Sequence, residues 1–376
     1  MTELVAYADL ADDPIVGAAR AARANPAALP ILERALFDQT GGLPRAIAER
    51  VLASDGPFAR AARAGLADDA RIAVATGDLQ ELGDLAHGIG GLRVTDPGRP
   101  PDGPHAPLVE VLLRDFDWGR QARVLAGFYR AHGCGPLAVH RVLRFDGALH
   151  GVRNPDPIRL SDLEGRDDLR GALIEDLDAF TSREPVNDAL LYGAPGTGKS
   201  ATVRACAEAF AGHGLRLIQV DREHLEQIDM LFDLVIGDGP SCLVYLDDLV
   251  FDDAARADRA LRAALEGGVT ARPRNVLIWA TSNRLNLTHS THSERADEID
   301  DAEARGEKTA LANRFGRRVR FDVRGEEWYL QIVNRLLRER LGTVPPDVED
   351  EALRYARTGA GPTPRTAHHF AAWYRP

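Results

Sequence analysis

The chain has 376 residues, which is enough for two or three domains with hydrophobic cores of their own. Acidic residues outnumber basic ones by 57 to 46, and the net charge of −11 argues against broad non-specific binding to nucleic acid, although a local basic channel in an assembly would survive it. No apolar run approaches the length of a transmembrane helix, and no signal peptide is recognisable. The three cysteines, Cys134, Cys206 and Cys242, are scattered in apolar settings that favour reduced, buried thiols. We therefore expect a cytoplasmic protein with no membrane contact.

The first part of the chain, to about residue 150, carries apolar residues at helical spacing, separated by Gly and Pro. Examples are residues 30–37, 43–52 and 109–113. Residues 92–107 are rich in Pro and Gly and predict an exposed linker. Residues 120–130 fit either a basic helix face with exposed aromatic rings or an ordinary amphipathic helix with its rings in the core, and we favour the second. We predict an α-helical accessory domain over residues 1–152.

The middle of the chain alternates strands with helices. A proline-containing connector at 153–160 precedes a predicted helix at 166–182, and another helix is expected at 253–266. The predicted strands are 187–193, 216–221, 242–248, 275–281 and 318–322. Continuous apolar strands between helices predict an α/β core, residues 153–324, with a five-stranded parallel sheet and helices on both faces.

After residue 325 the pattern becomes purely helical. Helices are expected at 326–341, 347–357 and 365–373. We therefore place a separate helical unit at residues 325–376.

A glycine-rich loop follows the first predicted strand of the core. Gly193, Gly198, Lys199 and Ser200 fill the fixed positions of the phosphate-binding pattern G-x-x-x-x-G-K-[ST]. The chain has only two lysines, so a chance match that includes the lysine is improbable. The candidate nucleotide-binding residues are Gly193, Ala194, Pro195, Gly196, Thr197, Gly198, Lys199, Ser200 and Ala201.

This loop has the chemistry that phosphate binding requires. Glycines at 193, 196 and 198 let consecutive backbone N–H groups converge on phosphate oxygens, and a helix that begins near Lys199 points its N-terminal dipole at the same anion. Lys199 is expected to bridge the β- and γ-phosphates, and the Ser200 hydroxyl to ligate Mg²⁺. The loop predicts binding of a nucleoside triphosphate.

Polar side chains follow two of the later strands. Asp247 and Asp248 come at the end of an apolar strand, and Asn283 comes after the next strand. Such residues are common as turn formers and helix caps, but the upstream loop favours a functional role for them. Asp247 suits Mg²⁺ ligation, Asp248 could orient or deprotonate the attacking water, and Asn283 could hold that water.

These parts, in this order, resemble the AAA+ ATPases over residues 155–373. The resemblance implies ATP as the nucleotide, Walker B at Asp247, a first sensor at Asn283 and a helical lid at the C-terminus. It also implies that Arg314 is an arginine finger that reaches the γ-phosphate of a neighbouring subunit, and that Arg365 is a second sensor that reaches the nucleotide of its own subunit. A finger that acts in trans implies a homo-oligomer, either a ring or an open spiral. Either arginine could instead be a surface ion-pair residue.

A narrower resemblance is to an uncharacterised bacterial AAA+ family catalogued as domain of unknown function eight hundred and fifteen. It rests on six stretches of the sequence, namely residues 155–160, 162–165, 215–221, 265–273, 280–284 and 313–316. It implies the same fold and an ATPase activity.

Some features depart from the family pattern. Many AAA+ proteins have Glu where this chain has Asp248, which leads us to expect slow hydrolysis. Residues 221–230 lack the aromatic–hydrophobic–Gly tripeptide of protein-threading rings, which weakens an unfoldase interpretation.

Several histidines are the other candidates for chemistry. His289 and His292, with Glu294 nearby, lie in a charged insertion at 287–309, but no second cluster completes a site, and we expect no metal other than Mg²⁺. His368 and His369 are expected on the surface or packed within the lid.

Two functional hypotheses remain. The first is an Mg²⁺-dependent ATPase whose homo-oligomer remodels or loads a macromolecular partner, with a protein favoured over nucleic acid. The second is an ATP-switched binding or scaffold module with little or no hydrolysis.

Overall fold

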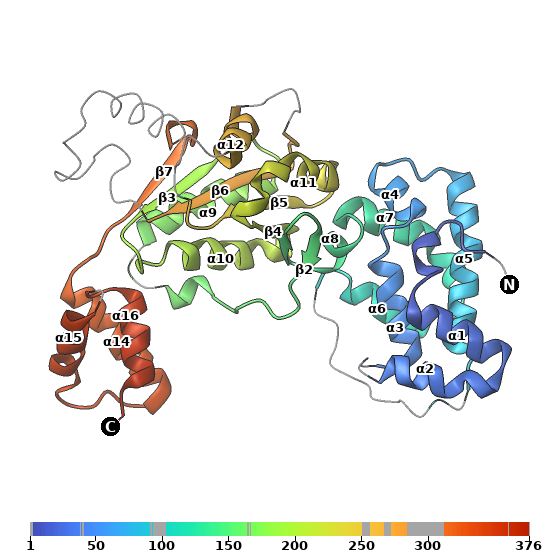
Figure 1. The fold of residues 1–376 in the computed structure, drawn as a ribbon, viewed down its shortest axis with the longest axis horizontal. Helices are drawn as coiled ribbons and strands as arrows, with labels where there is room; N and C mark the ends of the chain where they lie inside the picture. The colour runs from blue at the N-terminus through green and yellow to red at the C-terminus, as the bar shows by residue number, and fades with distance from the viewer. Residues whose placement is uncertain are drawn as a thin grey trace.

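The protein consists of a helical N-terminal part, a central sheet covered by helices, and a helical C-terminal part, which follow one another along the chain (Figure 1). The computed structural model describes residues 3–37, 39, 41–90, 92, 103–163, 165, 167–249, 256–266, 272–283, 312–359 and 361–375. Within these ranges, no helix combines the length and the apolar character that crossing a membrane requires.

The N-terminal part packs around its own hydrophobic core, in which Tyr7 and Trp118 are fully buried. The rings of Phe128 and Tyr129 are also buried, so the helix that begins at Ala122 is amphipathic with its rings in the core, as favoured above for residues 120–130. Of the proposed linker at 92–107, residues 93–102 lie outside the described residues. The helices are α1 (Pro14–Ala24), α2 (Leu29–Leu36), α3 (Gly42–Leu52), α4 (Pro57–Arg63), α5 (Asp69–His87), α6 (Ala106–Arg114), α7 (Ala122–His132) and α8 (Pro136–Val139).

In the described part of the chain, the central sheet has seven strands in the order β2-β1-β4-β5-β6-β3-β7. All neighbouring strands are parallel except β1 and β2, which are antiparallel. The five predicted strands are all present, with ends shifted by no more than two residues. The strands are β1 (Val142–Phe145), β2 (Leu149–Gly151), β3 (Ala189–Gly193), β4 (Leu215–Val220), β5 (Ser241–Leu246), β6 (Val276–Ser282) and β7 (Arg317–Phe321).

The sheet is larger than the five strands we expected, because residues 142–151 add a hairpin at its edge. We had placed these residues in the N-terminal helical domain. The hairpin turns at Asp146 and Gly147, and Gly147 has φ of +96°, a conformation that favours glycine. An Asp-Gly pair between short strands is a hairpin signal, and it was overlooked because the strands are only four and three residues long. The sheet thus begins at Val142, and the domain limits at 152 and 324 stay a prediction.

Helices cover both faces of the sheet (Figure 1). On one face, Leu173 and Val203 pack in a core with Leu191 of β3. On the other face, Leu231 and Leu261 pack in a second core with Leu190. Alternate residues of β3 therefore point to opposite faces, as in any strand that is buried on both sides. The helices of the first face are α9 (Asp167–Thr181) and α10 (Lys199–Phe210), and those of the second are α11 (Ile228–Val235) and α12 (Arg256–Glu266).

The C-terminal part is a separate helical bundle, which we call the lid, with three helices among its described residues. Its own core contains Tyr329, Val333 and Phe370. Its helices are α14 (Glu326–Leu341), α15 (Val348–Thr358) and α16 (Pro364–Trp373), close to the ranges that the sequence predicts. The result is an α/β fold with a mostly parallel sheet, a helical N-terminal region and a helical lid.

Candidate functional site

The phosphate-binding loop connects β3 to α10, at the carboxyl end of a strand inside the sheet. Two of its glycines are required by the packing around them. Gly193 has φ of +132°, and a Cβ there would lie 2.2 Å from the carbonyl oxygen of Phe321 on β7. Gly196 has φ of +76°, and a Cβ there would lie 3.1 Å from Oγ1 of Thr363 in the lid. A side chain at position 193 would clash with β7, and one at position 196 would crowd Thr363 of the lid and strain the backbone.

Lys199 is the first residue of α10 and is almost fully buried. Its ammonium donates hydrogen bonds to the carbonyl oxygens of Gly193 and Ala194, at 2.9 and 2.8 Å, and to Oδ1 of Asn283, at 2.9 Å. The loop and the end of β6 thus hold this cation at a fixed place in the site.

Ser200 and Asp247 meet across the site. The Ser200 hydroxyl donates to Oδ1 of Asp247 at 2.9 Å, which joins the start of α10 to the end of β5. Tyr245 and Thr281 donate to the same oxygen, Thr281 at 2.7 Å. Burial raises the pKa of Asp247, but these three hydrogen bonds outweigh it, and the pKa of Asp247 is lowered overall. Asp247 therefore keeps its negative charge at neutral pH.

Asp248 is tied to the neighbouring strand by two contacts. Its backbone N–H donates to Oγ1 of Thr281 at 2.9 Å, and its Oδ1 accepts a hydrogen bond from Nδ2 of Asn283 at 2.6 Å. Asn283 therefore contacts Lys199 through its amide oxygen and Asp248 through its amide nitrogen. Asp248 has φ of +53°, in the left-handed region that Asp and Asn enter more readily than other residues that carry a side chain.

A cavity of about 350 Å³ lies between the loop, the strand ends and the lid. Its volume is in the range of small-molecule binding sites. Of the nucleotide-binding residues proposed from sequence, those from Gly196 to Ala201 line it, whereas Gly193, Ala194 and Pro195 do not. Its lining also includes Asp247, Asp248, Asn283 and Arg365.

The lid closes one side of the cavity through contacts with the core. The backbone N–H of Arg365 donates to the carbonyl oxygen of Gly196 at 3.3 Å, and the guanidinium of Arg335 donates to the carbonyl oxygen of Asp162 at 3.0 Å. Thr363 caps α16 by accepting a hydrogen bond from the N–H of Thr366. These contacts hold Arg365 at the first turn of a helix beside the phosphate-binding loop.

Arg314 is placed differently from the other candidates. It is half-buried just before β7, and it is not among the described residues that line the cavity of its own chain. The histidines of the charged insertion, His289 and His292, and the nearby Glu294, for which we expected no metal site, lie outside the described residues.

Sequence reasoning missed several residues of the cavity wall. His368 was expected on the surface or within the lid, yet it lines the cavity, where burial first, and then Arg335, lower its pKa. Its spacing of three from Arg365 places both on one helix face, which is a signal that could have found it. The remaining missed lining residues are Asp162, Leu163, Thr202, Arg204, Thr281, Trp328, Ile332 and Pro364.

Tyr245 was also missed, because it occurs in the apolar run of β5. Its side chain is buried, and its hydroxyl donates to Asp247. Burial, and then the contact with Asp247, raise the pKa of Tyr245 above its ordinary value.

The residues present suit a nucleotide with Mg²⁺. Mg²⁺ prefers oxygen ligands and is commonly held in phosphate-transfer sites by one hydroxyl and one or two carboxylates. The Ser200 hydroxyl and the Asp247 carboxylate supply such oxygens next to the ammonium of Lys199. The buried cation and the loop N–H groups suit an anionic phosphate chain.

The fold and this site define the class of the protein. A phosphate-binding loop at the end of an inner strand of a mostly parallel sheet, with acidic and amide side chains at neighbouring strand ends and a helical lid, is the arrangement of a P-loop α/β fold. The family model described as "Protein of unknown function (DUF815)" matches residues 137–375, and the chain belongs to this family. The matched region begins just before β1 and ends in the lid.

Among curated proteins, none matches the sequence. Among solved structures, the Holliday junction branch migration motor RuvB of Thermotoga maritima is 17% identical, with a TM-score of 0.39 over 57% of this chain and 63% of that chain. A point variant of the same motor gives 17% identity and a TM-score of 0.40, again over 57% and 63%. The match spans less than two thirds of the motor chains, and at this identity the likeness concerns the fold alone.

Proposed function

We propose that this protein binds ATP with Mg²⁺ and hydrolyses it. The observation that supports the proposal most is the contact of Asn283 with both Lys199 and Asp248, beside the contact between Ser200 and Asp247. One cavity therefore contains a cation that suits phosphate, two oxygen ligands that suit Mg²⁺, and a carboxylate that suits the attacking water. An isolated phosphate-binding loop would not need the second carboxylate.

Each residue has a distinct part in the proposed reaction. Lys199 binds phosphate oxygens as a point charge, and Ser200 and Asp247 hold Mg²⁺. Bound Mg²⁺ supplies positive charge to the phosphate oxygens. Asp248 orients the attacking water and accepts its proton, and Asn283 positions both Asp248 and the water. Arg365 contacts the nucleotide from the lid of the same subunit.

The test is phosphate release from ATP by the full chain, with and without Mg²⁺. We expect Lys199→Ala to lower turnover about 100-fold or more, because a fixed cation in the site is lost. Arg34→Ala removes an exposed cation of α2 and serves as the control, with turnover unchanged. Turnover like that of the unmodified protein in Lys199→Ala would refute the proposal. Tight ATP binding with negligible turnover in the unmodified protein would favour the alternative, an ATP-switched binding or scaffold module.

We further propose that Arg314 acts in the site of a neighbouring subunit in a homo-oligomer. The support is that Arg314 does not line the cavity of its own chain, although it lies three residues before β7 begins, and β7 pairs with the strand of the loop. A finger arginine contributes about 10³–10⁵-fold in rate. The oligomer would use ATP hydrolysis to remodel or load a partner.

Mixing two inactive variants tests this arrangement. Arg314→Ala keeps its phosphate-binding loop, and Lys199→Ala keeps its arginine, so a shared site regains activity when the two are mixed. Specific activity of the unmodified protein should also rise with protein concentration. Activity that is independent of concentration and of Arg314 would overturn the assignment.

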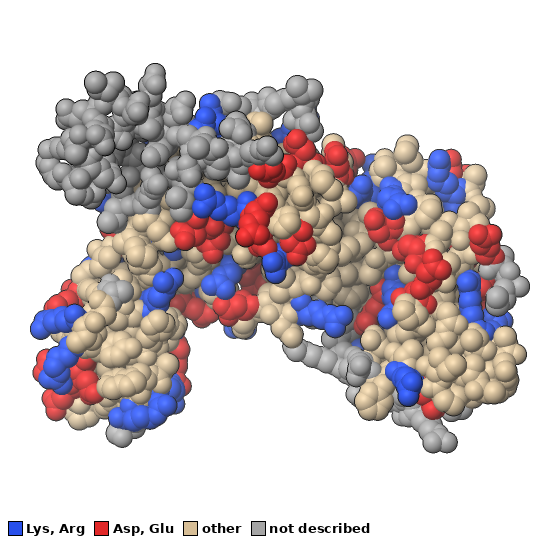
Figure 2. Space-filling model, viewed as in Figure 1, with Lys and Arg blue, Asp and Glu red and all other residues tan. Residues whose placement is uncertain are grey.

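The partner we favour is a protein in the cytoplasm. The chain is acidic overall, and on the face shown in Figure 2 basic and acidic side chains are interspersed over the core and lid and do not form one basic stripe. The three cysteines are buried free thiols, which suits a reducing compartment. Stimulation of ATP hydrolysis by added DNA would contradict the choice of a protein partner.

A further inference from the structure

Two of the side chains that contact Asp247 have no part in the reaction proposed above. Asp247 directly follows the apolar strand β5, and the two oxygens of its carboxylate have different surroundings. All three hydrogen bonds that described residues give to this carboxylate reach Oδ1, and they come from Ser200, Tyr245 and Thr281. The other oxygen, Oδ2, receives none of them.

The three donors come from three different elements. Tyr245 lies two residues before Asp247, so both side chains point to the same face of the sheet. Thr281 comes from β6, where Leu246 pairs with Ala280, and continuing this register by one residue places Thr281 beside Asp247. Ser200 comes from α10, which covers this face. The position of Oδ1 is therefore fixed by a helix and two strands.

The three donors differ in whether they have a role besides their hydrogen bond to Asp247. The Ser200 hydroxyl is the proposed metal ligand, and it must present its oxygen to Mg²⁺. Tyr245 is only 2% exposed and has its ring in the core of α9 and α10. An ionised carboxylate only accepts hydrogen bonds, so the phenol must be the donor. A buried phenol without a partner would be costly, which commits Tyr245 to Asp247.

We propose that Tyr245 and Thr281 are positioning residues that lock the Asp247 carboxylate through Oδ1 and so leave Oδ2 directed to the metal. The inference rests on the proposed function, because it concerns the Mg²⁺ of that site. The hydroxyls of Tyr245 and Thr281 hold Asp247 in one rotamer. They also donate hydrogen bonds to Oδ1, the carboxylate oxygen that does not bind the metal in this proposal. Such outer hydrogen bonds to a ligand set its orientation, and losing one costs about 10–100-fold in metal affinity.

The test is the Mg²⁺ concentration needed for half-maximal tight binding of a fluorescent ATP analogue, which is independent of turnover. Tyr245→Phe keeps the ring and removes only the hydroxyl, and we expect it to raise this concentration about 10-fold. Binding of the analogue in EDTA should stay unchanged, because the loop and Lys199 are intact. Replacing Mg²⁺ by Mn²⁺ and counting free Mn²⁺ by electron paramagnetic resonance gives a second, direct measure of metal affinity.

Two further variants separate positioning from general damage to the fold. Tyr129→Phe also removes a buried hydroxyl, one that donates to the carbonyl oxygen of Val51 in the N-terminal part, and it should leave the Mg²⁺ dependence unchanged. Thr281→Ser keeps the hydroxyl and should bind Mg²⁺ nearly as well as the unmodified protein, whereas Thr281→Val should resemble Tyr245→Phe.

The outcomes distinguish this inference from the proposed function. Unmodified protein that binds no ATP analogue at any Mg²⁺ concentration would refute the proposed function. Unmodified protein that binds the analogue with Mg²⁺, together with a folded Tyr245→Phe that shows the same Mg²⁺ and Mn²⁺ dependence, would overturn the inference alone.

Discussion

At the scale of single residues, Asp248 shows how the backbone limits the choice of side chain. Its φ of +53° is tolerated by Asp and Asn because their short polar side chains bond locally, whereas longer residues lose about 1 kcal/mol or more there. Both its backbone and its carboxylate are held from β6 and the residue after it, by Thr281 and Asn283. The shorter acid in this chain therefore suits a turn in which a glutamate would be strained.

This geometry predicts that Asp248→Glu does not make the protein a faster ATPase. We expect kcat to fall several-fold, because the longer arm disturbs both the turn and the contact with Asn283. Asp248→Asn suits the same backbone and removes only the charge, so its kcat should fall about 100-fold through loss of the base. Steady-state hydrolysis of ATP by the two variants measures both effects, and a rise in kcat for Asp248→Glu would contradict the strain argument.

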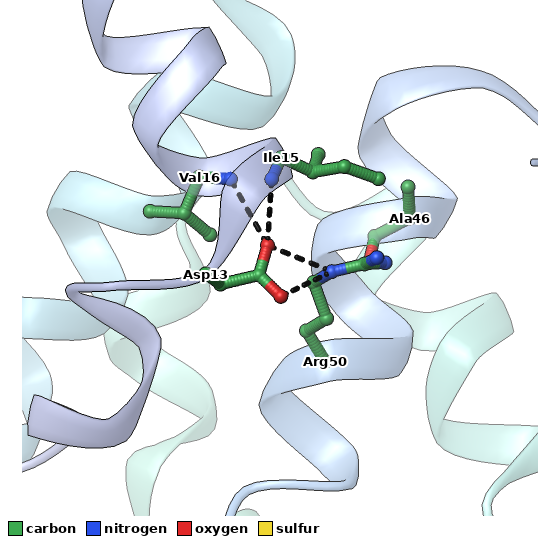
Figure 3. Close-up of polar contacts among 5 residues, drawn as sticks. All are labelled: Asp13, Ile15, Val16, Ala46 and Arg50. Carbon is green, nitrogen blue, oxygen red and sulfur yellow. Dashed lines mark hydrogen bonds and ion pairs between the residues drawn. The ribbon is translucent and has the colours of Figure 1, made fainter. Parts of the chain in front are cut away.

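At the scale of elements, helix α1 shows how one side chain can both start a helix and fix its neighbour. Asp13 precedes α1, and its Oδ1 accepts hydrogen bonds from the N–H groups of Ile15 and Val16 at 2.9 and 3.1 Å (Figure 3). Arg50 of α3 reaches the same carboxylate, with 2.8 Å between Nε and Oδ2, while it also donates to the carbonyl oxygen of Ala46. The cap therefore ties two helices of the N-terminal part together.

Substitution of Asp13 separates the two contributions. Asp13→Ala loses the cap and the ion pair, and we expect the free energy of unfolding of the N-terminal part to fall by about 1–2 kcal/mol. Asp13→Asn retains an oxygen for the cap and should lose less. Urea denaturation followed by circular dichroism gives both values. Equal losses in the two variants would show that the ion pair with Arg50, and not the cap, carries the effect.

At the scale of the whole molecule, a buried arginine joins the N-terminal part to the sheet. Arg216 of β4 is 1% exposed and donates to the carbonyl oxygen of Leu137 at 3.0 Å. Its Nη2 lies 3.4 Å from Nδ1 of His132, at the end of α7. A guanidinium only donates, so Nδ1 must be the unprotonated acceptor. Burial, and then Arg216, lower the pKa of His132 to about 4.

The junction should therefore weaken in mild acid. A histidine whose pKa is lower in the folded than in the unfolded state stabilises the fold above its unfolded value of about 6.5, and that stability is lost as pH falls toward 4. His132→Gln offers Arg216 an amide oxygen that does not titrate, so its stability should fall less between these pH values. Urea midpoints measured across this range check the prediction.

A second histidine, on the surface of the central α/β part, provides a matched control for this prediction. His213→Gln replaces an exposed histidine and should retain the full pH dependence of the unmodified protein. If His132→Gln loses stability with acid as steeply as the unmodified protein does, the junction histidine is not responsible.

Local sequence was enough for those features that depend on neighbouring residues. The spacing of Gly193, Gly198, Lys199 and Ser200 predicted the loop, because backbone N–H groups converge there through local dihedral angles. Apolar runs bounded by turn residues predicted β3 to β7, and helical periodicity predicted the lid helices. Since carboxyl ends of parallel strands share one edge, Asp247 and Asn283 could also be expected near the loop.

Other features depend on which distant segments pack together, and only the tertiary structure decided them. The hairpin at 142–151 joins the sheet because β1 pairs with β4, more than 70 residues later in the chain, and the short strands alone gave too weak a pattern. His368 and Trp328 line the cavity because the lid folds onto the loop. Tyr245 looked like an apolar strand residue, since the role of its hydroxyl depends on the carboxylate that shares its face. Spacing along the chain fixes the local conformation and the chemistry of a motif, whereas the partners of a side chain depend on how the elements pack.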